Sequence, residues 1–175
     1  FTFKVQDGGG TSVSGDDNES PNATVTVNIT PVNDEPIANA QSVTVLEDIK
    51  TSITLTGDDG DADAIQSLTY ILTGLPGTGS LSETIGGSNI VSGNLPLTLA
   101  DAELFFTTAS NDVSQQTFTF KVQDGGGTAN SGVNLSPNAT VTVSITPVND
   151  VPVANAQSVT IIEDVETSIT LTGDD

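Results

Sequence analysis

The strongest constraint on the fold is a long internal repeat. The segment FTFKVQDGGG at residues 1–10 occurs again at residues 118–127, and after a one-residue deletion in the following loop the offset falls from 117 to 116 residues. Residues 36–59 match residues 152–175 at 19 of 24 positions, and four of the five differences exchange one aliphatic residue for another. A period of this length is too long for one turn of a solenoid and close to the usual size of an independent domain.

Each repeat is therefore expected to have a hydrophobic core of its own. The chain would contain one complete repeat at residues 34–149, the C-terminal part of a preceding repeat at residues 1–33 and the N-terminal part of a following repeat at residues 150–175. The chain has no initiator Met and begins like the middle of a strand. We therefore expect it to be a slice of a longer polypeptide.

Apolar residues alternate with Thr and Ser along several short stretches of the repeat. Phe118, Phe120 and Val122, for example, are separated by Thr119 and Lys121. A period of two places one face of a strand in a core and the other in water. Gly, Asn, Asp and Pro interrupt these stretches at short intervals. Seven strands are expected, at residues 42–46, 52–56, 67–72, 79–82, 103–107, 117–123 and 139–146.

The seven stretches predict an all-β fold. Seven strands in about 110 residues are typical of a Greek-key sandwich of the immunoglobulin-like or cadherin-like kind. The chain has no Cys and no Trp, which argues against the antibody type of this sandwich. One helical turn is expected at residues 99–104, immediately before the fifth strand.

The composition excludes several classes of chemistry. Because the chain has no His, Cys, Met or Trp, it cannot form a zinc finger, a thiol nucleophile, a disulfide or a His-based triad. Its 3 Lys plus Arg stand against 23 Asp plus Glu, for a net charge of -20. So few cations disfavour binding to nucleic acid or to an anionic membrane surface. No apolar run approaches the roughly 18 to 20 residues that span a bilayer, and insertion into a membrane is not expected.

The acidic residues gather in the predicted loops and at strand ends, while the outward strand positions are mostly Thr and Ser. Clustered carboxylates repel one another unless a cation lies among them, and oxygen ligands without His or Cys suit Ca²⁺. A solvated acidic surface is the simpler alternative. Residues 59–63 begin like an EF-hand loop, but Ala64 and Tyr70 stand where that loop requires Gly and Glu.

The order of the acidic motifs resembles that of the cadherin calcium motifs. VLED at residues 45–48 is followed by TSI at residues 51–53, DDGD at residues 58–61, VQDGG at residues 122–126 and VNDVP at residues 148–152. Together with the sequence motifs TFKVQDGGG and PVND-x-P, this order makes the chain similar to the bacterial cadherin-like (Ig-like) tandem repeats of giant surface adhesins. The chain departs from cadherins at two places. The linker has PV at residues 147–148 where cadherins have an extra Asp, and SND at residues 110–112 replaces their acidic motif between the fifth and sixth strands. Both departures imply fewer ions per junction.

The resemblance implies Ca²⁺ ligands at the two ends of the repeat. In a seven-strand Greek key, the second-to-third and sixth-to-seventh loops share one end, and the first-to-second and fifth-to-sixth loops share the other. The ligands expected at the first junction are Asn33, Asp34, Asp58, Asp59, Asp61, Asp63 and Asp124. Those expected at the second junction are Glu47, Asp48, Asn111, Asp112, Asn149, Asp150, Asp174 and Asp175.

Three functions compete. The first is a structural extension repeat of a long bacterial cell-surface adhesin or filament, extracellular and rigidified by calcium, whose partners are the neighbouring repeats of the same chain. In the second, the repeat itself binds carbohydrate or like repeats in cell-cell adhesion, with lateral or homophilic self-association. The third is a glycosidase with paired carboxylates such as Asp101 and Glu103. The repetition favours the first, and no enzyme is expected.

Overall fold

The structure, a computed structural model, describes residues 1–8, 19–62 and 64–174. The chain divides into two compact units, Phe1–Val32 and Asn33–Asp175. In the first unit, β1 (Thr2–Phe3) and β2 (Ala23–Thr24) pair in antiparallel fashion. All the other strands belong to the second unit.

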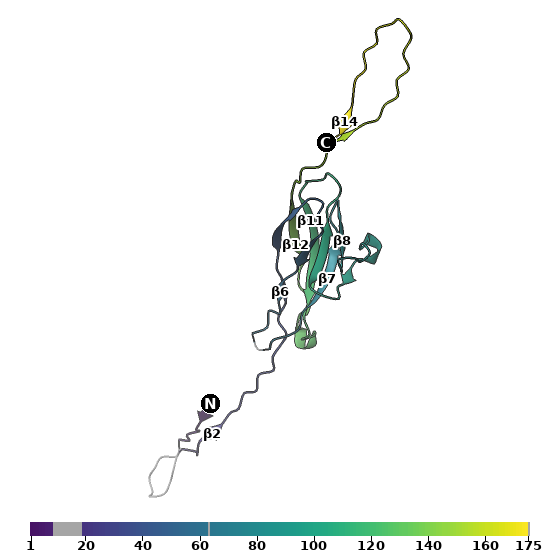
Figure 1. The fold of residues 1–175 in the computed structure, drawn as a ribbon. Helices are drawn as coiled ribbons and strands as arrows, with labels where there is room; N and C mark the ends of the chain where they lie inside the picture. The colour runs from purple at the N-terminus through teal and green to yellow at the C-terminus, as the bar shows by residue number, and fades with distance from the viewer. Residues whose placement is uncertain (9–18, 63, 175) are drawn as a thin grey trace. The chain divides into compact units, whose positions relative to one another are not determined.

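Two sheets form a sandwich around one hydrophobic core (Figure 1). The larger sheet has the order β4 (Gln41–Leu46), β12 (Ala139–Thr146), β11 (Gln116–Gln123), β7 (Thr69–Gly74) and β9 (Leu97–Thr98). The smaller sheet has the order β5 (Thr51–Thr54), β10 (Glu103–Thr107) and β8 (Ser80–Ser82). Both sheets contribute to the core, since Phe106 of β10 is buried together with Phe118 and Phe120 of β11. The predicted all-β sandwich is confirmed.

The alternating sequence explains which face of each strand is inside. In β11, Phe118, Phe120 and Val122 are at most 1% exposed, whereas Thr119 and Lys121 between them are only partly buried. β-Branched and aromatic side chains favour such half-buried pleated strands. One face of β11 therefore packs in the core while the other keeps its hydroxyl and ammonium groups near water.

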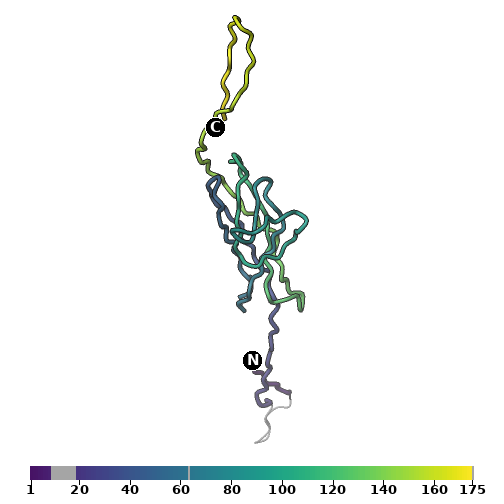
Figure 2. The backbone as a smooth tube through the Cα atoms, turned by 45° about the vertical axis from the view of Figure 1, so that its right-hand side comes forward, coloured from purple at the N-terminus to yellow at the C-terminus, as the bar shows by residue number. Residues whose placement is uncertain are grey.

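The chain enters the sandwich through β3 (Ile37–Ala38), which pairs antiparallel with the later strand β6 (Gly57–Asp58). Two residues separate β3 from β4, which pairs in parallel with β12 at the edge of the larger sheet. Figure 2 shows the path of the backbone through these segments. The parallel pairing brings the ends of β4 and β12 together, which matters for the site described below.

The predicted strands are found, but the expected number is too low. A strand occurs at each of the seven expected ranges, with the expected bounds at β10 and β12 and with shifts of one or two residues elsewhere. The described residues also contain the two-residue strands β3, β6 and β9. Pairs this short leave no periodic signal in a sequence, because alternation needs several residues to become visible.

The helical turn expected at residues 99–104 is wrong. Residues 100–102 form a bend, and the backbone N–H of Ala100 donates to Glu83 Oε1 at 2.8 Å. Single 3₁₀ turns occur instead at Ser92–Asn94 and Ala129–Ser131. Among the described residues, no helix is long and apolar enough to cross a membrane.

The C-terminal segment reproduces only part of its counterpart in the complete repeat. β13 (Val153–Ala154) pairs with β14 (Gly173–Asp174) in the register that β3 and β6 use. Between them, the residues matching β4 and β5 form no strand, and Leu171 is 84% exposed, whereas its equivalent Leu55 is 1% exposed. Among the described residues, the segment matching β4 and β5 thus has neither a partner strand nor a core.

We predict that Phe120→Ala lowers the free energy of unfolding by about 3–5 kcal/mol, because it leaves a cavity in the shared core. The matched control is Phe3→Ala, since Phe3 holds the same place in the sequence repeat but is 45% exposed. Urea unfolding followed by circular dichroism measures both. Equal losses for the two variants would contradict the assignment of the core.

Candidate functional site

Asn33 is held at one end of the sandwich by the loop that follows β11. Its Nδ2 lies 3.1 and 3.2 Å from the two carboxylate oxygens of Asp124 and donates to the carbonyl of Val133 at 2.6 Å. The backbone carbonyl of Asn33 accepts from the N–H of Val133 at 3.1 Å. Side chain and main chain of this linker residue are thus both fixed to the repeat that follows it.

Gln66, which precedes β7, connects Asn33 to the acidic loop before it. Its Nε2 donates to Asn33 Oδ1 at 2.6 Å and to Asp61 Oδ2 at 3.0 Å, and its backbone N–H donates to Asp59. Gln66 Oε1 is buried and has no hydrogen-bond partner among the described residues. Nothing in the sequence marks Gln66 as part of the site except its place, three residues after the last acid of the run at residues 58–63.

Two glycines make room for the Asn33 side chain. A Cβ on Gly126 would lie 1.8 Å from Asn33 Oδ1, and a Cβ on Gly132 would lie 3.0 Å from Asn33 Cβ. The glycine-rich segment after Asp124 is therefore required for close approach of the linker. We call the residues around Asn33 the Asn33 socket; they are Gln66, Asp124, Gly126, Gly132 and Val133.

The structure brings part of the first predicted ligand set together. Asn33, Asp59, Asp61 and Asp124 are linked by the hydrogen bonds of Asn33 and Gln66. Asp58 lies in β6, and its Oδ1 accepts from the N–H of Gly60 at 2.8 Å. Asp34 is exposed. Asp63 lies outside the described residues.

Glu47 is the central residue at the other end. It follows β4 directly, is 3% exposed, and its backbone N–H donates to the carbonyl of Thr146 at 3.0 Å. Glu47 Oε2 accepts from the N–H of Val148 at 3.3 Å. Glu47 Oε1 is buried without a hydrogen-bond partner in the described part of the chain, which is costly for a carboxylate.

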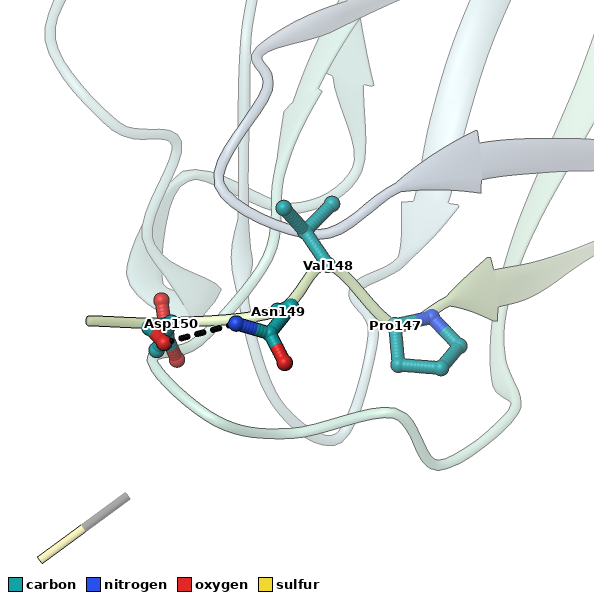
Figure 3. Close-up of a pocket in the computed structure, with 4 residues that line it drawn as sticks. All are labelled: Pro147, Val148, Asn149 and Asp150. Carbon is teal, nitrogen blue, oxygen red and sulfur yellow. Dashed lines mark hydrogen bonds between the residues drawn. The ribbon is translucent and has the colours of Figure 1, made fainter. Parts of the chain in front are cut away.

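In the linker beyond Val148, Asn149 and Val151 are exposed and Asp150 is partly buried. A shallow pocket is lined by Pro147, Val148, Asn149 and Asp150 (Figure 3). There, the amide of Asn149 points along the linker and donates to the carbonyl of Asp150 at 2.9 Å. This differs from Asn33, its equivalent in the repeat, whose amide is engaged by the socket.

The remaining residues of the second set are engaged separately from one another. Asp48 and Asn111 have φ angles of 62° and 56°, and the N–H of Asp48 donates to Thr108 Oγ1 at 3.1 Å. Asp174 accepts from Asn155 at 3.0 Å. Asp175 lies outside the described residues. Within the described residues, no three acidic side chains are grouped so that they could hold a metal ion.

Asp112 is surrounded by hydroxyl and amide donors. Its carboxylate accepts from the hydroxyl groups of Ser114 and Thr78 and from the backbone N–H of Ser114 at 2.9 Å. These hydrogen bonds, of which that from the Ser114 hydroxyl is the largest cause, lower the pKa of Asp112 below its ordinary value of 3.8.

A third group of acids lies beside the start of β10. Asp101 and Glu103 share a pocket with Glu83, Thr84, Ile85, Ala100 and Phe105. Two of these carboxylates already accept backbone N–H groups, since Glu83 binds Ala100 and Asp101 binds Ala102. The arrangement serves the bend before β10.

We expect Gly126→Ala to displace Asn33 and to lower the free energy of unfolding by about 1–3 kcal/mol, because the buried Asp124 loses a donor. Gly125→Ala is the control, since a Cβ there would be 3.8 Å from the nearest atom, an ordinary contact. Chemical unfolding measures both variants. Similar stabilities would show that the linker does not sit against Gly126.

Ser114→Ala should raise the pKa of Asp112 towards 3.8 by removing its strongest donor. Because the folded pKa is below the unfolded one, this carboxylate stabilises the fold above the unfolded pKa, and the stabilisation disappears as the pH falls through the folded pKa. Carboxyl NMR titration of the wild type and the variant tests this. An unchanged pKa would mean that the Ser114 hydroxyl does not bind Asp112 in solution.

Comparison with known proteins gives a family match and a distant structural likeness. Residues 33–146 match the family described as "Bacterial Ig domain". No curated protein matches the chain. Among solved structures, the ASH / PapD-like domain of human CEP192 (PapD-like domain 7) is similar at 8% identity and a TM-score of 0.35, covering 73% of this chain and 96% of that chain.

The family match covers the sandwich described above. It begins at Asn33, the residue held in the socket, and ends at residue 146, the last residue of β12. It therefore includes the strands of both sheets and most of the chain. The chain belongs to the bacterial Ig domain family.

Proposed function

We propose that the complete repeat is a structural extension unit of a long bacterial surface protein. The observation that carries this is the attachment of the chain at both ends of the larger sheet. Asn33 is bound beside the end of β11, whereas Val148 is bound beyond the end of β12. Because β11 and β12 are antiparallel, these points lie at opposite ends of the sheet. A domain whose two linkers are fixed at opposite ends of its sheet holds the two neighbouring repeats in a fixed orientation relative to each other.

The partial repeats at both termini support a tandem arrangement. Phe1 and Phe3 are 77% and 45% exposed, while their equivalents Phe118 and Phe120 are at most 1% exposed. In the complete repeat, these positions face the core between the two sheets. We propose that residues 1–33 and 150–175 are parts of neighbouring repeats whose remaining strands bury the same apolar faces.

We also propose that Ca²⁺ binds at junctions between complete repeats. The main support is Glu47, whose buried Oε1 has no hydrogen-bond partner among the described residues and whose Oε2 faces the linker. Asp150 lies on the same linker, and an oxygen-rich acidic set of this kind suits Ca²⁺. Since the described residues of one repeat do not assemble three acids for a metal, the ligand set would need acids from the next repeat.

In this proposal, bound calcium stiffens the junction by drawing the carboxylates together. Glu47 would contribute from the preceding repeat, Asp150 from the linker, and the equivalents of Asp59 and Asp61 from the following repeat. The ion would neutralise their mutual repulsion, which is strongest at low salt. A surface location outside the cell, where calcium is abundant, agrees with this role.

The extension function is tested by the tumbling of two complete repeats. In a stretch of the same polypeptide that contains both, ¹⁵N relaxation should give one common, anisotropic correlation time in calcium-containing buffer. The fixed attachment of the linker predicts this result. Independent tumbling of the two repeats, as for two domains joined by a flexible linker, would contradict the proposal.

The calcium part has its own test in the same two-repeat protein. Calcium at a hundredfold excess over its Kd should stabilise the fold by about 2.7 kcal/mol, and chelation should remove this gain. Glu47→Gln keeps the acceptor for Val148 but removes the charge, so it should weaken calcium binding in a calorimetric titration. Asp101→Asn is the matched control, because Asp101 belongs to the bend before β10 and is not in the proposed ligand set. If both variants bind calcium like the wild type, Glu47 is not a ligand.

A further inference from the structure

We propose that the Asn33 socket is a metal-independent binding site for the Asn of the linker that leads from the preceding repeat. Together with the hydrogen bond between Val148 and Glu47, it would give each linker two attachments on adjacent residues, one to each of the repeats that the linker joins. The inference rests on the tandem arrangement proposed above. It differs from the calcium proposal, because Asn33 itself is bound by hydrogen-bond donors and acceptors, whereas Gln66 Oε1 in the same socket has no hydrogen-bond partner among the described residues.

The first attachment is the socket itself. The Asn33 amide donates to the Asp124 carboxylate and to the carbonyl of Val133, while its oxygen accepts from Gln66. Asp124 is 6% exposed. A hydrogen bond to a buried carboxylate is stronger than a neutral one. The donors of Asn33 and of the Gly126 N–H already engage Asp124, so its oxygens are satisfied without a cation.

The second attachment is made at the other end of the same repeat. The N–H of Val148 donates to the carboxylate of Glu47 at 3.3 Å. This bond follows from the topology, because the parallel pairing of β4 with β12 places Glu47 beside the residues that leave β12. Val148 is therefore tied to the repeat that precedes it.

The internal repeat places both attachments on one linker. At an offset of 116, Val32 and Asn33 are equivalent to Val148 and Asn149. The Val residue is held by the preceding repeat and the Asn residue by the following one, so a single peptide bond separates them. In this chain, the equivalents of Gln66 and Asp124 that would receive Asn149 are not included, and its amide binds the neighbouring carbonyl of Asp150.

The socket also defines which partner fits. A following repeat needs a carboxylate for the amide and two glycines whose missing Cβ atoms leave space for the Asn side chain. The first 32 residues keep this pattern in sequence, with Asp7, Gly9 and Gly15 at the places of Asp124, Gly126 and Gly132. The partner is thus another repeat of the same kind.

Hydrogen exchange of the Val133 amide in the 175-residue chain tests the socket, because this N–H donates to the carbonyl of Asn33. Asn33→Asp places a carboxylate against Asp124, and it should speed exchange about tenfold or more. Asn33→Ala should act in the same direction. Asn149→Asp is the matched control and should leave Val133 unchanged, since its socket is not in this chain. Amides of β11 and β12 show whether each variant is folded.

A chelator separates the socket from a calcium site. Wild-type protection of Val133 should be the same in calcium and in EDTA. The proposal is overturned if EDTA removes this protection, because a cation then holds the linker. It is also overturned if Asn33→Asp and Asn33→Ala exchange like the wild type. This test is independent of the test of the extension function. Val133 exchange reports on one repeat alone, whereas the extension function would be contradicted by independent tumbling of two repeats.

Discussion

Among the described residues, strands longer than two residues occur only where a partner strand and a core are both present. The comparison is made within one chain, because residues 152–175 are nearly identical in sequence to residues 36–59. In the complete repeat, this sequence forms β4 and β5 and buries Leu55, but at the C-terminus only the β13–β14 pair forms and Leu171 is exposed. Local preference for extended structure is therefore insufficient, and non-local pairing with β10 and β12 decides the fold. The same dependence makes each repeat a cooperative unit.

Much of this fold can be predicted from the sequence, because its strands are long enough to show alternation. β11 and β12 were predictable from Phe118, Phe120, Val141 and similar residues, whose spacing is local information. The bend before β10 was not predictable, and a helical turn was expected there instead, because Glu83 accepts the N–H of Ala100 from a distant position in the chain. The same reason hides Gln66, whose role depends on Asn33 in the preceding linker. Interactions between loops involve single residues that are far apart in the sequence, so they produce no periodic pattern from which they could be predicted.

The two ends of the sandwich use carboxylates differently. At the first end, Asp124 is satisfied by the amide of Asn33 and by a backbone N–H. At the second end, one oxygen of Glu47 is buried without a partner among the described residues. A hydrogen-bonded carboxylate fixes geometry by itself, whereas an unsatisfied one needs a further ligand. This contrast underlies our proposal that the linker is positioned by hydrogen bonds and that calcium acts next to Glu47.

The central claim is that repeats joined in this way build a stiff, extended molecule, and small-angle X-ray scattering of a length series tests it most directly. Stretches of the polypeptide with two, three and four complete repeats would be compared in calcium-containing buffer. Our account predicts that the maximum dimension grows by the same increment with each repeat, because every linker has the same two attachments. Growth with only about the square root of the repeat number, as for a flexible chain, would contradict it.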